Sequence, residues 1–240
     1  MNYVDIHSHI LPGVDDGAQD VETAVKILEM MKEQGITDVF ATPHFDASQC
    51  SFEEFNNDVS NARKLLAEAT YGTDIPQVHI GCEVYYFPGI SKSGGIKQLT
   101  LGGSKFLLLE LCYGQAITDK VVREIVDVYN NFGIVPVIAH IERYSKEKGF
   151  KKLLDLISHR ICIAQINAAS LMDKQPYKRI SLKLIKLGYI SFIASDAHSV
   201  KFRPPLMDKA FDVIKNNLGQ EYVDAFAKNS NDFYRHVIEK

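Results

Sequence analysis

The sequence has no pair of cysteines spaced for a structural metal site or a redox motif. Its four cysteines are far apart and form no CxxC pair: Cys50, Cys82, Cys112 and Cys162. Three of them lie within apolar runs, where a thiol behaves as a small hydrophobic side chain. We therefore expect free cysteines in the core or in loops, in a reducing compartment.

The sequence also lacks an excess of positive charge and any long apolar run. It has 27 Lys and Arg against 30 Asp and Glu, a net charge of −3, so electrostatics gives no reason to expect nucleic acid or an anionic membrane as partner. The N-terminal MNYVDIHSH has neither the basic nor the apolar region of a signal peptide, and no run suits a bilayer. We expect a cytoplasmic protein without membrane insertion.

No linker rich in Pro, Gly or Ser divides the 240 residues. The length suits one α/β barrel, so we predict a single domain over residues 1–240. A chain this long buries enough surface to fold without a disulfide or metal. Any metal that it binds is therefore expected to serve catalysis rather than stability.

Short apolar, β-branched runs alternate with amphipathic helical patterns along the chain. The predicted strands are 3–7, 38–42, 77–83, 106–111, 135–140, 161–167 and 190–195. Asp20 and Thr118 are placed to cap helices that Gly35 and Gly133 end, and further helices are predicted at 52–69, 150–158, 177–187 and 205–217. Seven strands alternating with helices indicate a closed or nearly closed (β/α) barrel, with a doubly wound open sheet as the alternative. The remaining stretch, 220–240, is expected to be helical or irregular, with its aromatic residues packed on the barrel.

Histidines and acidic residues gather where the predicted strands end. Functional side chains of such barrels lie at these C-terminal ends, and five of the eight histidines fall there. The candidates are His7, His9, His44, Glu83, Glu110, His140, Asp196 and His198. Carboxylates converging from apolar strands repel one another unless cations lie between them. The set predicts two or three divalent ions, and imidazole with carboxylate but no thiolate favours Mn²⁺, Fe²⁺ or Zn²⁺, with Mg²⁺ also open.

These residues, taken in order, resemble the polymerase and histidinol phosphatase (PHP) superfamily. The stretches HSHILPGVDDG, ATPHF, GCEVYY, IAHIERY and IASDAHS followed by RPP look like the manganese-dependent protein-tyrosine phosphatases of bacterial capsule and exopolysaccharide systems. The resemblance extends from Asp5 to about Asp212. It implies a distorted, TIM-like (β/α)7 barrel and up to three metal ions.

The resemblance also implies which residues bind each ion. One ion would take His7, His9, Glu83 and Asp196, a second Glu83, Glu110 and His140, and a third Asp16, His44 and His198. The choice of Asp16 over its neighbour Asp15 rests on the DDG motif of the family. The chain departs from the commoner family pattern at Asn229-Ser230, where relatives tend to carry Asn-Pro.

The mechanism that follows is hydrolysis of phosphotyrosine by a hydroxide that bridges two metal ions. We expect Arg143 and Arg203 to clamp the phosphoryl group, because a guanidinium fork fits phosphate oxygens; a surface ion pair is the alternative for each. Asp196 or His198 would assist the leaving group directly or through water. The family's usual partner is a tyrosine kinase with a tyrosine-rich tail, and a homo-oligomer is left open.

Three other functions compete with this interpretation. A small-molecule phosphomonoesterase of the same superfamily, similar to histidinol-phosphate phosphatase, is the main alternative. A DNA-trimming nuclease is disfavoured because no basic stripe is present, and a catalytically silent metal-binding protein because every expected ligand is present. A cysteine-dependent tyrosine phosphatase is excluded, since no cysteine is followed by arginine six positions later.

Overall fold

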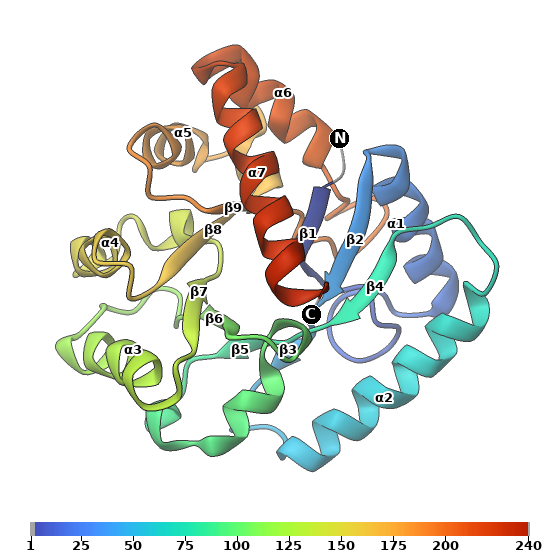
Figure 1. Cartoon of the computed structure of the whole chain (residues 1–240), viewed down its shortest axis with the longest axis horizontal. Coiled ribbons are helices and arrows are strands. Elements are labelled where there is room, and N and C mark those ends of the chain that lie inside the picture. The colour runs from blue at the N-terminus through green and yellow to red at the C-terminus, as the bar shows by residue number, and fades with distance from the viewer. Residues whose placement is uncertain (1–2, 240) are drawn as a thin grey trace.

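The computed structural model describes residues 3–239 and arranges parallel strands as the staves of a barrel (Figure 1). The strands are β1 (Tyr3–Ser8), β2 (Ile36–Ala41), β3 (His44–Phe45), β4 (Gln77–Ile80), β5 (Glu83–Tyr85), β6 (Phe106–Glu110), β7 (Val135–Ile138), β8 (Ile163–Asn167) and β9 (Phe192–Ala194). They form one sheet ordered β1-β2-β4 and another ordered β3-β5-β6-β7-β8-β9. A parallel bridge between Ser8 and Ala197 joins the first stave to the last.

Two of the staves are each built from two short strands. β2 continues into β3 and β4 into β5, and the ladder between them persists: the Gly81 N–H donates to Ala41 O at 2.9 Å and the Glu83 N–H to Pro43 O at 3.1 Å. Pro43 has no N–H of its own to donate, and a side chain at Gly81 would meet Leu101 at 2.5 Å. The ring thus has seven positions, which confirms the predicted distorted (β/α)7 barrel.

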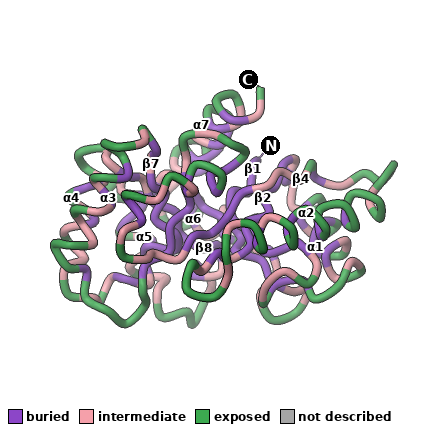
Figure 2. The backbone as a smooth tube through the Cα atoms, turned by 90° about the horizontal axis from the view of Figure 1, so that it is seen from below, coloured by how far each residue is buried: buried purple, intermediate pink, exposed green. Residues whose placement is uncertain are grey.

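Helices cover the outside of the strands, and their inner faces and the strands are buried (Figure 2). They are α1 (Val21–Glu33), α2 (Phe52–Ala69), α3 (Asp119–Phe132), α4 (Phe150–Ser158), α5 (Lys178–Lys186), α6 (Met207–Leu218) and α7 (Gln220–Val237). Short 3₁₀ helices occupy Ile90–Lys92, Gly94–Leu99, Leu101–Gly103, Ile141–Tyr144 and Ala168–Leu171. Within residues 3–239, no helix combines the length and the apolar character needed to cross a membrane.

The predicted helix caps are present. The Asp20 side chain accepts a hydrogen bond from the Thr23 N–H at 2.7 Å, and Thr118 accepts one from the Val121 N–H. Gly133 ends α3 with φ 66°, a left-handed conformation that glycine adopts without strain. Local sequence signals therefore fix where α1 and α3 begin and where α3 ends.

The C-terminal helix α7 closes the end of the barrel at which the strands begin (Figure 1). Its Phe233 ring lies 5.4 Å from Phe40, 5.3 Å from Phe106 and 5.4 Å from Phe192, measured between ring centroids. Ser230, on the same helix, accepts a hydrogen bond from the Val4 N–H at 2.7 Å. The serine that departs from the family pattern thus satisfies a buried backbone donor of β1, a bond that a proline side chain cannot make.

Replacing Phe233 with alanine should lower the free energy of unfolding by about 3–5 kcal/mol, since it removes a buried aromatic ring and leaves a cavity. Chemical denaturation measures the change. Tyr71→Ala is the matched control, because the Tyr71 side chain is 91% exposed. A loss for Phe233→Ala no larger than that of the control would show that α7 does not close the barrel.

Candidate metal centre

The nine side chains predicted as metal ligands lie together at the C-terminal ends of the strands. Three groups have ligand atoms within 4.8 Å of one another: His7, His9 and Asp196; His9, Asp16, His44 and His198; and His44, Glu83 and Glu110. His140 joins them, with its Nε2 3.0 Å from Glu83 Oε1 and 3.3 Å from Glu110 Oε1. Each group lies among described residues, and together they form one continuous cluster.

The first group together with Glu83 has the spacing of ligands around one ion. His7 Nε2 and His9 Nε2 lie 3.1 Å apart. Glu83 Oε2 lies 3.1 Å from the first nitrogen and 3.2 Å from the second, and Asp196 Oδ1 lies 3.4 Å from each. Ligands placed about 2.1 Å from a common ion are separated by roughly 3.0–3.4 Å, so the four atoms can share one metal.

Hydrogen bonds on the far side of each ring orient the two histidines. His7 Nδ1 lies 3.3 Å from Gln165 Oε1, and His9 Nδ1 lies 2.7 Å from Asp15 Oδ2. Both partners accept hydrogen bonds, so Nδ1 carries the proton in each ring and the Nε2 lone pair faces the other histidine. Two lone pairs at this distance need a cation or a proton between them.

Glu83 connects this group to the next one. Its Oε2 faces His7 and His9, whereas its Oε1 faces His140. Another of the three groups includes Asp16, whose Oδ1 lies 3.5 Å from His44 Nε2 and 3.4 Å from His198 Nε2.

The neighbouring aspartate, Asp15, has a different position. Its carboxylate accepts hydrogen bonds from the backbone N–H groups of Gly17 and His44 as well as from His9. Asp16 rather than Asp15 therefore faces His44 and His198, while Asp15 orients His9 from behind.

Three buried polar atoms in the cluster have no hydrogen-bond partner: His44 Nδ1, Glu110 Oε2 and His198 Nε2. Leaving such an atom unsatisfied costs about 1–3 kcal/mol. All three belong to predicted ligands, and a divalent cation would satisfy them. The donor set thus fits metal ions.

Two of the predicted ligand residues have an uncommon backbone conformation. His140 has φ 32° and Asp196 has φ 51°, in the left-handed region that residues other than glycine rarely adopt. Such a conformation costs on the order of 1–3 kcal/mol and persists where surrounding contacts impose it. Here the imposed turns direct an imidazole and a carboxylate into the same cluster.

Both predicted arginines lie at the mouth of the site. Arg143 Nη2 is 3.0 Å and Arg203 Nη2 is 2.7 Å from the same atom, Asp196 Oδ2. Their side chains are 31% and 39% exposed, and they border a cavity of 230 Å³ that Tyr177 and Phe202 also line. Two guanidinium groups that converge next to a metal ligand are suited to hold an anion in that cavity.

Sequence reasoning missed the residues that support the ligands. Gln165 and Asp15 hydrogen-bond His7 and His9, and Asn167 Nδ2 donates to Asp196 Oδ2 at 2.5 Å. Polar amides at alternate positions of an otherwise apolar strand, IAQIN, were the available signal, because such residues share one face. The Tyr85 ring stacks on the His44 ring, with the two ring centroids 4.8 Å apart.

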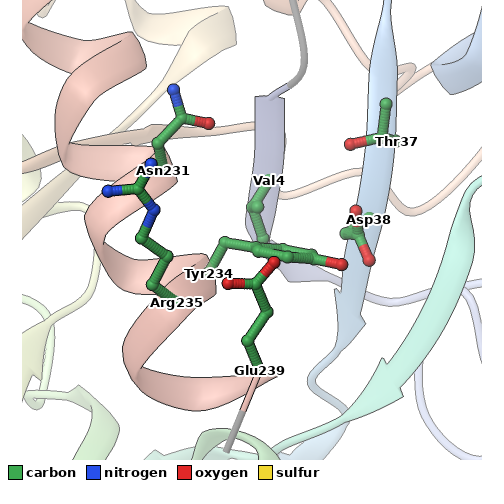
Figure 3. Close-up of a pocket in the computed structure, with 7 residues that line it drawn as sticks. All are labelled: Val4, Thr37, Asp38, Asn231, Tyr234, Arg235 and Glu239. Carbon is green, nitrogen blue, oxygen red and sulfur yellow. The ribbon is translucent and has the colours of Figure 1, made fainter.

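A larger cavity, of 550 Å³, lies at the opposite end of the barrel between α7 and the strands (Figure 3). Val4, Asp38, Tyr234 and Arg235 line it. Its buried carboxylate, Asp38, is already paired with His79 at 2.8 Å. The groups able to hold a metal, among residues 3–239, all lie at the other end, so the chemistry belongs there.

Comparison with known proteins gives consistent matches over nearly the whole chain. The family described as capsular polysaccharide synthesis, CpsB/CapC, matches residues 3–235. The tyrosine-protein phosphatase YwqE of Bacillus subtilis is 31% identical over 236 residues, covering 95% of this chain and 89% of that protein.

Two solved structures extend the comparison. One, from crystal structures of YwqE from Bacillus subtilis and CpsB from Streptococcus pneumoniae, metal-dependent tyrosine phosphatases, matches with TM-score 0.82 and 28% identity, over 98% of this chain and 94% of that one. A histidinol phosphate phosphatase from Lactococcus lactis matches with TM-score 0.56 and 16% identity, over 90% and 94%. The second likeness shows the fold alone.

The carboxylates of the cluster control the protonation of its histidines. Burial opposes a charge on His140, but hydrogen bonds with Glu110 and Glu83 outweigh it and raise its pKa to about 9. Burial likewise opposes protonation of His9, yet Asp15 and Asp196 raise its pKa well above the usual range. His198 differs: burial and the neighbouring His9 lower its pKa to about 3, so it is neutral and ready to bind a cation.

Binding of Mn²⁺ should therefore release protons and weaken as the pH falls. Because their pKa values are raised, His9 and His140 are imidazolium cations in the metal-free protein at neutral pH. A metal ion binds only the neutral ring, so the affinity for Mn²⁺ should rise with pH up to about 9. Calorimetric titration near pH 7 in buffers of different ionisation enthalpy should show about one to two protons released. Affinity that does not change with pH, without proton release, would contradict this assignment.

Proposed function

Because the chain belongs to the CpsB/CapC family of capsular polysaccharide synthesis, we propose that its metal centre hydrolyses phosphotyrosine in proteins. The protein is a metal-dependent tyrosine phosphatase, a phosphoric monoester hydrolase, as its curated relatives are. The main observation in support is that Asp196 contacts both the cluster of imidazoles and carboxylates, through Oδ1, and the two arginines, through Oδ2.

We assign one metal ion to each of three sets of ligands drawn from this cluster. His7, His9, Glu83 and Asp196 would hold one ion, Glu83, Glu110 and His140 a second, and Asp16, His44 and His198 a third. Bound divalent ions supply a water-derived nucleophile at neutral pH and offset the charge that develops on phosphoryl oxygens. Five imidazoles with four carboxylates and no thiolate support Mn²⁺, Fe²⁺ or Zn²⁺. The resemblance to manganese-dependent phosphatases puts Mn²⁺ first, with Mg²⁺ also open.

The chain's own side chains would bind and orient the phosphoryl group. Arg143 and Arg203 would each give a guanidinium fork to its oxygens. Burial would raise the pKa of Asp196, but His7, His9 and Arg203 lower it well below the usual range, and the pKa of His198 is about 3. At neutral pH Asp196 is a carboxylate and His198 a neutral imidazole, so neither is in its acid form and their help to the departing phenolate would pass through a water molecule.

The physiological substrate that we propose is a phosphotyrosine protein of capsule or exopolysaccharide synthesis, such as a bacterial tyrosine kinase with a tyrosine-rich tail. Family membership and the names of the relatives support this context. We place the reaction in the cytoplasm, where the enzyme would reach such a tail. We also propose that residues 1–240 form a single domain. Association into a homo-oligomer stays a prediction.

Metal-stripped protein should not hydrolyse a phosphotyrosine peptide, and Mn²⁺ should restore hydrolysis better than Fe²⁺, Zn²⁺ or Mg²⁺ added singly. Histidinol phosphate assayed in parallel separates this function from its main alternative. The proposal predicts a much higher kcat/KM for the peptide. Faster turnover of histidinol phosphate would favour the small-molecule phosphomonoesterase, and full activity after chelation would exclude metal dependence.

Arg143→Ala and Arg203→Ala should each lower kcat/KM for phosphotyrosine peptide by about 100-fold or more, the usual effect of removing one donor to a charged transition state. Arg→Lys at either position should restore little, because an ammonium lacks the planar fork. Arg235→Ala is the control, since Arg235 lies at the far end of the barrel. Wild-type kcat/KM in Arg143→Ala would show that its assigned role is wrong.

A further inference from the structure

Strand β8 provides none of the nine predicted metal ligands, yet two amide side chains extend from it toward the cluster. Gln165 is fully buried and Asn167 is 3% exposed. The two residues are separated by one position, so both project from the same face of the strand. Buried amides at a metal site need partners for all their polar atoms, and their partners are metal ligands.

The amides form a chain of hydrogen bonds with a single direction. Gln165 Oε1 accepts from the His140 N–H at 2.9 Å, and Gln165 Nε2 donates to Asn167 Oδ1 at 2.8 Å. Asn167 Nδ2 then donates to Asp196 Oδ2 at 2.5 Å. A backbone N–H can only donate and a carboxylate can only accept, so the two ends fix the orientation of both amides.

The same chain reaches a third ligand. Gln165 Oε1 also accepts from His7 Nδ1 at 3.3 Å, which keeps that proton away from the cluster and leaves the His7 Nε2 lone pair facing it. One pair of neutral side chains thus contacts His7, His140 and Asp196, which come from three different strand ends.

Asp196 shows why a neutral contact is needed. Its Oδ2 accepts from three donors: Arg143 Nη2, Arg203 Nη2 and Asn167 Nδ2. All three donors line the cavity, but the arginine side chains are 31% and 39% exposed, whereas Asn167 is 3% exposed and is also bonded to Gln165. Of the three donors on Asp196 Oδ2, Asn167 is therefore the one whose other hydrogen bond fixes it within the protein.

We propose that Gln165 and Asn167 are positioning residues that hold His7 and Asp196 in metal-binding geometry, so that Arg143 and Arg203 are free to exchange Asp196 for phosphate. The role of the arginines in this inference rests on the proposed function. The hold on the ligands does not, because it concerns the affinity for metal and can be measured without substrate.

The test measures Mn²⁺ affinity by calorimetry, in the full chain, for four variants. Asn167→Leu keeps the approximate size and removes the donor. Asn167→Asp keeps the shape and the acceptor for Gln165 but places a carboxylate beside Asp196. The double variant Arg143→Ala/Arg203→Ala removes the other two donors, and Asn130→Leu, at an exposed position of α3, is the matched control.

Loss of an outer partner of a metal ligand typically lowers metal affinity by about 10–100-fold. We expect a loss of this size in both Asn167 variants, larger for Asn167→Asp, and less than about threefold in the arginine double variant and the control. Far-UV circular dichroism of the metal-free proteins verifies folding, and if the leucine variant fails to fold the aspartate variant decides.

Two results would overturn the proposal. One is wild-type Mn²⁺ affinity in a folded Asn167 variant. The other is a loss in the arginine double variant equal to that in the Asn167 variants, which would make the arginines the hold on Asp196. The measurement contains no phosphotyrosine. Its outcome can therefore be interpreted even if phosphotyrosine proves not to be the substrate.

Discussion

The buried carboxylate of Glu83 is the group on which the rest of the site depends. It is 1% exposed, and nitrogen atoms of His7, His9, His44 and His140 all lie 3.0–3.2 Å from its two oxygens. Burial would raise its pKa, but His7 and His140 lower it well below the usual range, so it stays ionised. A buried charge of this kind is stable only when opposite charge surrounds it, which divalent ions bound at the cluster would provide.

The barrel makes this arrangement possible because its parallel strands bring their C-terminal ends to one rim. The residues that stabilise the barrel and the residues of the candidate site lie at opposite ends of its axis. The floor is closed by Phe233 and Ser230 of α7, whereas the ligands occupy the rim. The strained backbone at His140 and Asp196 is therefore supported by a core that takes no part in the reaction.

The sequence was informative where local physics decides. Apolar strands followed by histidines and acidic residues predict a cluster at one rim of the barrel, and Asp20 and Thr118 mark helix starts. It was silent where tertiary contacts decide. No local signal distinguishes Asp16 from Asp15, since the two are adjacent in one loop. Only the folded backbone directs their side chains to different partners. The breaks at Pro43 and Gly81, and the pairing of Gln165 with Asn167, likewise depend on neighbouring strands rather than on spacing.

The most direct test of the metal centre is a crystal structure grown with excess Mn²⁺ and measured with anomalous scattering at the manganese edge. The account predicts anomalous peaks on both sides of Glu83, one among His7, His9 and Asp196 and one beside Glu110 and His140. Well-ordered crystals in which Glu83, His140 and Asp196 lie apart, with no anomalous peak among them, would contradict it.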